Sequence, residues 1–259
     1  MKTPYLFMGA PPFTPPPSIV DTMRHLWSFA LHPKQVQREH NVLEVKLPLI
    51  FQILLIQLVV LTLLLVLLSL VYKTIGFQLQ HLGEAWTYLE GKPFVLLFIT
   101  LILLAPIQEE IVFRLPLLYS GGFVLTALAV FAFHYGPVLA TAAGLALPQA
   151  LLLLAVLIGA VLLFIKKPVW RENLRKLWQY HFGLVFYFFT LLFALMHLLN
   201  YRNVDFPAYL LPMLVLPQLV GGIFLGYTRL RLGLGWSIVQ HMFNNALILF
   251  LIYGYLASN

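Results

Sequence analysis

Two acids and one base lie within six residues of an otherwise apolar stretch, the segment PIQEEIVFR at residues 106–114. Each charge near the centre of a spanning helix costs about 2.5–3.5 kcal/mol, so such residues indicate function. On a helix, Glu110 and Arg114 share a face and can form a structural ion pair. Glu109 lies about 100° away and keeps a carboxylate that can act as a base. A purely structural polar knot between helices is the alternative.

Two further apolar stretches carry histidines. Phe193 and His197 are one helical turn apart, which seats an imidazole beside an aromatic ring. Ser237, His241 and Asn245 follow at four-residue steps and form a polar stripe along one helix face. Either group could also serve only to hold helices together in lipid. Phe193 and Ser237 are expected to support the site rather than to react.

These side chains allow two kinds of hydrolytic chemistry. Glu109 and His197 could share and activate a water molecule, while His241 and Asn245 stabilise the oxyanion that forms. This reading requires no cofactor. Alternatively, Glu109, His197 and His241 could hold a divalent metal such as zinc. The spacing of the residues does not decide between the two.

The composition excludes several classes of protein. The chain has 61% hydrophobic and 10% charged residues, which is not the composition of a soluble domain. Its net charge of +7 comes mostly from residues between apolar runs, a pattern of membrane proteins rather than of nucleic-acid binders. The absence of cysteine excludes thiol chemistry. The only aspartates, Asp21 and Asp205, lie outside the apolar runs, which excludes an intramembrane aspartyl dyad.

Apolar stretches from residue 47 onward predict an all-α, polytopic transmembrane helical bundle of about seven or eight spans. We place them at 47–72, 94–118, 123–142, 145–165, 182–200, 208–228 and 235–256. Gly136, Pro137, Gly144 and Pro148 are expected to form the turn between the third and fourth.

The loop charges predict the orientation. Twelve Lys and Arg fall on the side of the N-terminus, five of them in a basic loop at 166–176, against Lys73, Lys92 and Arg202 on the other side. Positive loops face the cytoplasm, so the protein is expected in the plasma (inner) membrane with its N-terminus cytoplasmic. The Pro-rich tail, residues 1–46, contains either a short interfacial helix from Ile19 to Leu31 or an unstructured arm.

The sequence resembles the CAAX-processing and bacteriocin-immunity membrane endopeptidases, the Abi or CPBP family, which are similar to the Ras-converting CAAX endopeptidase of eukaryotes. The resemblance rests on three motifs that stand in the family's order on separate apolar spans. They read Glu109-Glu110-x-x-x-Arg114, Phe193-x-x-x-His197 and His241-x-x-x-Asn245.

The resemblance implies an intramembrane endopeptidase that cuts a membrane peptide or protein within the lipid bilayer. It assigns water activation to Glu109 and His197, and the oxyanion site to His241 and Asn245. Members have been regarded both as metalloproteases and as metal-free glutamate enzymes. We favour the metal-free version because Asn245 is a poor zinc ligand.

The resemblance also divides the chain. The protease domain covers 94–259, with a probable insertion at 121–181, after the tail and a first span with its loop at 47–93. A non-catalytic bacteriocin-immunity or membrane scaffold protein of the same family remains the main alternative. A proton-coupled transporter is a third reading, because buried Glu and His residues also relay protons.

Overall fold

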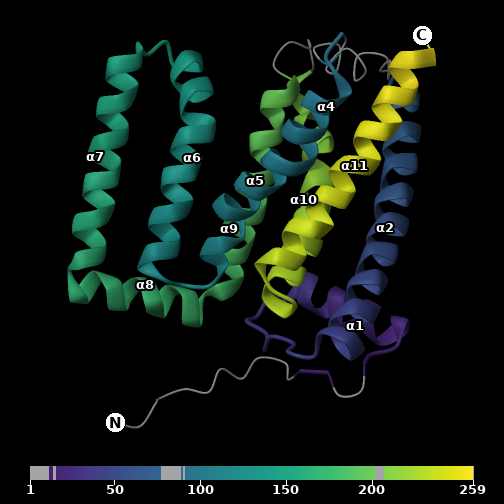
Figure 1. Cartoon of the computed structure of the whole chain (residues 1–259), viewed down its shortest axis with the longest axis horizontal. Helices are drawn as coiled ribbons and strands as arrows, with labels where there is room; N and C mark the ends of the chain where they lie inside the picture. Colours follow the sequence, from purple (N-terminus) through teal and green to yellow (C-terminus); the bar gives the residue numbers. More distant parts are fainter. Residues whose placement is uncertain (1–11, 14–15, 77–88, 90, 202–206, 259) are drawn as a thin grey trace.

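The computed structural model describes residues 12–13, 16–76, 89, 91–201 and 207–258. Three residues lie outside these ranges: Lys2, which is one of the twelve basic residues on the N-terminal side, Arg202 and Asp205. The described chain is a bundle of long helices with two shorter helices, α1 and α8, lying across one end (Figure 1). The elements are α1 (Ile19–Leu31), η1 (Val42–Lys46), α2 (Leu47–Thr74), α4 (Phe94–Leu97), η3 (Phe98–Leu104), α5 (Ala105–Phe113), η4 (Leu115–Leu117), α6 (Gly121–Ala142), α7 (Leu147–Lys166), α8 (Pro168–Tyr180), α9 (Phe182–Met196), η5 (His197–Tyr201), η6 (Ala208–Leu210), α10 (Leu211–Arg231) and α11 (Leu234–Ser258).

The prediction of a polytopic helical membrane protein is confirmed. Six helical runs in the described residues are long and apolar enough to cross a membrane, or up to seven if α7 and the bent α8 count as one span. Large apolar side chains cover their outer faces, such as Leu63 at 64% and Phe133 at 79% exposure. Hydrocarbon rather than water is the solvent that suits such a surface.

The turn between α6 and α7 differs in detail from the expectation. It is made at Gly144, whose positive φ of 67° suits glycine, and Pro148 lies in the first turn of α7. Pro137, expected in the turn, instead lies inside α6. Neighbouring helices and local adjustments tolerate such a proline within a span.

The second span is not a uniform α-helix. Its middle, η3, is π-helical, so the N–H of Ala105 donates to the carbonyl of Thr100, five residues back. In the same register, residue 106 would donate to Leu101, but Pro106 has no N–H. The carbonyl of Leu101 is therefore left without a backbone donor at a point where the chain lies in the membrane.

The segment expected to be a basic loop at 166–176 is mostly helical. α8 begins directly after Lys167, whose extended backbone ends α7, and has proline in its first turn. The axes of α7 and α8 differ by 92°. Its charges had indicated a loop, whereas its alternation of apolar and charged residues at helical spacing favours an amphipathic helix.

The residues from Ile19 to Leu31, for which the sequence predicted a short helix, form α1. Ser18 begins the helix by accepting a hydrogen bond from the N–H of Asp21 at 3.2 Å. Leu26 and Phe29 on its inner face pack into the largest buried apolar cluster, beside Phe186. This part of the tail is thereby attached to the bundle.

A buried ion pair attaches tail residues on both sides of α1 to the bundle. Glu39 lies 3.2 Å from the guanidinium Nε of Arg231 at the end of α10, and both side chains are at most 2% exposed. The N–H of Phe13 donates to the same carboxylate at 3.0 and 3.2 Å. The guanidinium carbon of Arg231 lies 4.2 Å from the centre of the Phe13 ring. We call these three residues the tail clasp.

Candidate active site

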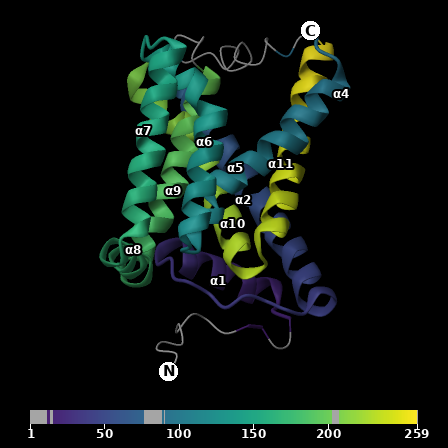
Figure 2. The ribbon, with the colours of Figure 1, turned by 60° about the vertical axis from the view of Figure 1, so that its left-hand side comes forward.

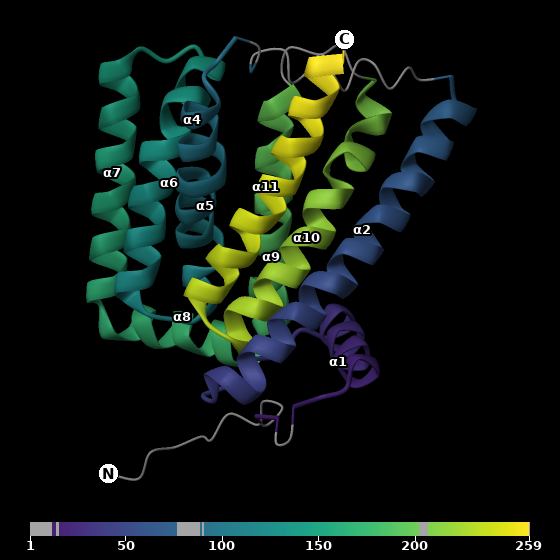
Figure 3. The ribbon, with the colours of Figure 1, turned by 45° about the vertical axis from the view of Figure 1, so that its right-hand side comes forward.

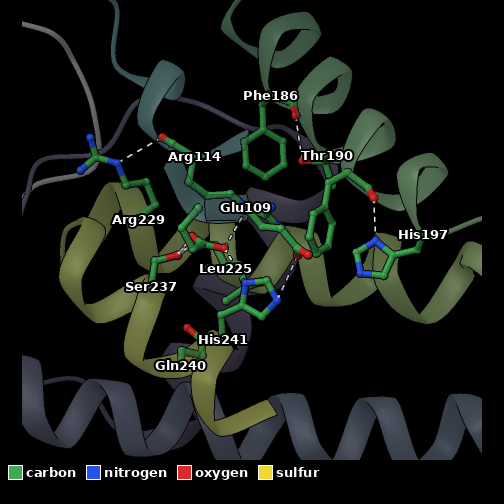
Figure 4. A network of polar contacts seen from close by, with 12 residues as sticks. Glu109, Arg114, Phe186, Thr190, His197, Leu225, Arg229, Ser237, Gln240 and His241 are labelled. Atoms are coloured by element: carbon green, nitrogen blue, oxygen red, sulfur yellow. Dashed lines mark hydrogen bonds and ion pairs between the residues drawn. The ribbon is translucent and has the colours of Figure 1, made fainter. Parts of the chain in front are cut away.

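The three motifs meet in the interior of the bundle (Figure 4). α5 carries both glutamates and ends at Arg114, α11 carries the stripe that includes His241, and α9 ends immediately before His197. α5 packs directly against both α9 and α11. Residues more than 80 positions apart in the sequence are thus gathered in one polar network within apolar surroundings.

Glu110 is the fully engaged carboxylate of the network. One of its oxygens lies 3.5 Å from Nε of Arg114, so the predicted ion pair is present. The same oxygen lies 3.0 Å from Nδ1 of His241, and the Ser237 hydroxyl donates to the other oxygen. Its side chain is 0% exposed. Such a buried charge is tolerated only because these partners replace its hydration.

His241 lies between the two glutamates. Its Nδ1 contacts Glu110, while its Nε2 is 3.5 Å from an oxygen of Glu109. The contact with Glu110 fixes the ring orientation and points Nε2 towards Glu109. The sequence had grouped His241 with Asn245. The structure brings it first against both carboxylates.

Glu109 is the second carboxylate of the network and lies outside the Glu110–Arg114 ion pair. Its side chain is 12% exposed, and within the described residues its buried Oε2 makes no hydrogen bond. The Ser237 hydroxyl donates to Glu110, and Arg114 pairs with Glu110 through Nε, while its Nη1 and Nη2 are buried without a hydrogen bond among the described residues. A buried oxygen without a donor marks a place for water or a substrate group. The division of labour expected between the adjacent glutamates therefore has a geometric basis.

His197 borders the network from α9. Its Nδ1 is 2.8 Å from the carbonyl oxygen of Phe193, so this nitrogen carries the proton. In the neutral ring, Nε2 is then an acceptor, as a base requires. No hydrogen bond joins His197 to Glu109 in the part of the chain that the structure describes, although the two are close enough for their charges to interact. A water molecule or a substrate would have to bridge them.

Phe193 stands between the charged groups. Its ring centre is 4.6 Å from that of His197 and 5.7 Å from that of His241. The guanidinium carbon of Arg114 lies 3.8 Å from the same ring centre. This contact stabilises a cation away from water and holds Arg114 in line with Glu110. Phe193 thus contacts both histidines and the arginine, and its supporting role stays a prediction.

The backbone of α10 approaches this stack closely at Gly222. A Cβ added there would lie 3.0 Å from Cγ2 of Thr190, 3.3 Å from the Phe193 ring and 3.4 Å from Nη2 of Arg114. Glycine at this position lets α10 press on the side chains that orient Glu110.

Asn245 contacts the second span rather than the glutamates. Its amide Nδ2 donates to the carbonyl of Leu101 at 2.8 Å. This is the carbonyl that Pro106 leaves without a backbone donor. One of the two N–H groups of the Asn245 amide is therefore used to complete η3.

The three candidate metal ligands are not grouped around one point. Among the residues that the structure describes, no three His, Asp or Glu side chains lie closely enough together to hold a metal ion. Glu109 and His241 are neighbours at 3.5 Å, whereas His197 packs against the ring of Phe193, at 4.6 Å between centres.

Sequence reasoning missed several polar residues that build the site. Gln240 donates to Gln57 at 2.6 Å and joins α11 to α2. Nε of Arg229 donates to the carbonyl of Arg114 at 3.2 Å, where α5 ends. Tyr135 of α6 is buried against Phe113, which precedes Arg114. Glutamines within apolar spans were the one visible signal, since polar side chains in lipid seek partners on other helices.

A known protein family matches this chain. The family model for Rce1-like type II CAAX prenyl endopeptidases matches residues 91–247, more than half of the chain. The matched range contains all three motifs and also spans the segment 121–181. No significant match was found among curated proteins or among solved structures.

Proposed function

Because the chain belongs to the Rce1-like family of type II CAAX prenyl endopeptidases, we propose that it cleaves a peptide bond within the membrane with a glutamate-activated water. The observation that carries this proposal is the unequal state of the two glutamates. Glu110 has three partners, whereas the buried Oε2 of Glu109 has no hydrogen bond and lies 3.5 Å from an imidazole. A purely structural cluster would gain nothing from the second carboxylate.

His241 has a carboxylate beside each ring nitrogen. Its Nδ1 lies 3.0 Å from an oxygen of Glu110, and its Nε2 lies 3.5 Å from an oxygen of Glu109. In the proposed mechanism both nitrogens carry a hydrogen, because a carboxylate can only accept.

The reaction follows from this arrangement. A substrate carbonyl entering beside His241 accepts its Nε2–H in place of Glu109, which leaves the Glu109 carboxylate free to take a proton. Glu109 takes a proton from water held by Nε2 of His197, and the water oxygen attacks the carbonyl carbon. The Nε2–H of His241 and the second N–H of Asn245 stabilise the oxyanion. The C–N bond then breaks, Glu109 returns the proton to the amine, and a carboxylic acid is released.

The proposal routes no step through a metal, because His197 is not grouped with Glu109 and His241 as a ligand. The substrate is a membrane peptide or membrane protein segment. The proposed orientation places α1 and α8 on the cytoplasmic side of the plasma membrane, because the basic residues of the described chain gather at this end.

The test is cleavage of a membrane-peptide library, including prenylated C-terminal peptides, by the full chain in proteoliposomes. Glu109→Gln, His197→Ala and His241→Ala should each lower the rate by a factor of about 10²–10⁴. Glu44→Gln, the same chemical change on the exposed side of η1, is the matched control. Wild-type cleavage should also survive a strong chelator.

An unchanged cleavage profile in Glu109→Gln would overturn the hydrolase and favour the non-catalytic immunity or scaffold reading. Loss of activity with chelator, restored by zinc, would instead replace the metal-free mechanism.

A further inference from the structure

α8 occupies an unusual place for a helix of a membrane protein. It lies at 92° to α7 and runs across the same end of the bundle as α1 (Figures 1, 2 and 3). A helix of 13 residues is too short to cross a bilayer, and this one lies nearly perpendicular to the long apolar helix α7. Its position is therefore that of an interfacial helix.

The two sides of α8 differ in chemistry. At about 100° per residue, the apolar residues of α8 fall within one half of its circumference and the charged residues within the other. Four large apolar side chains on the first half are exposed, at 70%, 44%, 38% and 71% respectively: Val169, Trp170, Leu177 and Tyr180. The charged half contains Arg171, Glu172, Arg175 and Lys176.

The charge of this segment is strongly positive. Five basic residues lie between 166 and 176, and the segment contains one acid, Glu172. Glu172 forms an exposed ion pair with Arg175 at 3.5 Å. Arg171 and Lys176 are exposed as well. An exposed apolar half next to a basic half matches the boundary between acyl chains and anionic headgroups.

α8 is nevertheless firmly attached to the protein. Trp178 is buried, and its indole N–H donates to the carbonyl of Pro116 at 2.7 Å. The Tyr119 hydroxyl donates to the carbonyl of Arg171 at 3.2 Å. These contacts lie just beyond Arg114, so α8 is fixed to the end of the helix that carries the glutamates.

α1 marks the same plane independently. Thr22, Leu26 and Phe29 face the bundle, whereas another of its faces exposes large apolar side chains. These are Val20 at 51%, Met23 at 52%, Trp27 at 69% and Leu31 at 53%. Two transverse helices at one end of the bundle, each with an open apolar face, indicate a common membrane interface.

We propose that α8 binds the headgroups of anionic phospholipids through Arg171, Arg175 and Lys176, while Val169 and Leu177 rest at the acyl boundary. This surface is separate from the hydrolytic site and does not depend on it. Its contact with η4 sets the depth of the glutamates relative to the headgroups of that leaflet.

The test measures lipid binding by the full chain in neutral detergent micelles, with fluorescent phosphatidylglycerol and phosphatidylcholine as probes. The wild type should prefer phosphatidylglycerol, and salt should weaken this preference. The triple variant Arg171→Gln, Arg175→Gln, Lys176→Gln should lose more than tenfold in affinity, since each cation contributes about a fivefold factor near a charged surface. The variant Arg171→Lys, Arg175→Lys keeps the charge and should bind as the wild type does.

Lys73→Gln removes a cation at the opposite end of α2 and should leave binding unchanged. If the triple variant folds poorly, Glu172→Gln gives a test in the other direction, because removing the acid should raise affinity. Equal binding of the two lipids, or unchanged affinity in both the triple variant and Glu172→Gln, would overturn the proposal. Neither result bears on cleavage by Glu109.

Discussion

The tail clasp and the active site contain the same elementary unit. In each, a carboxylate that is at most 2% exposed pairs with a buried arginine, Glu39 with Arg231 at 3.2 Å and Glu110 with Arg114 at 3.5 Å. In each, the guanidinium also lies over a phenylalanine ring, at 4.2 Å from Phe13 and 3.8 Å from Phe193. Burial, ion pairing and cation–π contact therefore do not distinguish the two.

The two regions differ in whether a carboxylate oxygen is left without a hydrogen bond. In the clasp, the backbone N–H of Phe13 also donates to Glu39, and the N–H of Glu39 donates to the carbonyl of Arg231 at 2.8 Å. The site adds a second carboxylate and an imidazole to the same unit, and Oε2 of Glu109 lacks a hydrogen bond. A closed pair holds two segments together, whereas a surplus titratable group can exchange a proton with a substrate.

The largest expected effect is a loss of cleavage when the candidate site is changed and the clasp is left intact. Glu109→Gln should lower cleavage by a factor of about 10²–10⁴ because it removes the base. The melting temperature should stay near that of the wild type, since Glu109 lies outside the Glu110–Arg114 ion pair and glutamine keeps its size and a polar contact with His241. Parallel cleavage and thermal-unfolding assays in proteoliposomes measure both quantities. A large fall in melting temperature would mean that Glu109 is structural.

The reciprocal change at the clasp should affect stability alone. Glu39→Gln leaves Arg231 buried without a counter-charge, at a cost of about 3 kcal/mol. For a chain of this length, that corresponds to a fall of roughly 10 °C in melting temperature. Turnover measured well below this temperature should match the wild type. Loss of turnover in the folded variant would show that the clasp takes part in the reaction.

A smaller effect should follow from crowding the arginine of the site. Gly222→Ala places a methyl group against Thr190, Phe193 and Arg114, and overpacking of this kind costs about 1–3 kcal/mol. Gly221→Ala is the matched control, because its Cβ meets only Nε2 of Gln57, at 3.9 Å. Cleavage rates of the two variants should differ, with Gly222→Ala the slower. Equal rates would argue against packing of α10 as the support of Arg114.

The smallest expected effect is a pH dependence of stability next to the clasp, at His25. Partial burial against Phe13 and the nearby Arg231 lower the pKa of His25, with Asp21 opposing. A lowered pKa means that the folded state resists protonation. Its stability contribution is therefore complete above the ordinary value of 6.5 and is lost as the pH falls from there through the lower folded pKa.

Limited proteolysis of the tail should accordingly be faster at about pH 5.5 than at about pH 8. His25→Phe keeps the ring contact and should reduce this difference. The effect is small because the His25 side chain is exposed.

Much of the architecture could be predicted from the sequence because its causes are local. Hydropathy placed the spans, and four-residue spacing predicted the pair of Glu110 with Arg114. Contacts that join distant segments could not be predicted in this way. Nothing near Glu39 indicates Arg231, and the bridge from His241 to both glutamates depends on how α5 and α11 cross. The sequence of α8 contains the amphipathic pattern, but its many charged residues led to the prediction of a loop.

The roles of individual site residues illustrate the same limit. Asn245 was expected at an oxyanion, which stays a prediction, and in the structure its amide donates to the carbonyl of Leu101. Pro106 is the local sign that this carbonyl would need a donor. The π-helical register that selects Leu101, rather than its neighbour, is a property of the folded bundle.

The hydrogen bond from Asn245 to Leu101 joins residues 144 positions apart, which has a consequence for biosynthesis. A ribosome adding about 5–20 residues per second needs roughly 7–30 s to pass from one to the other. During that interval the second span sits in the bilayer with an unmatched oxygen, and the glutamates have no imidazole from the last helix. On the proposed mechanism, a nascent chain therefore lacks a complete hydrolytic site until its final helix enters the membrane.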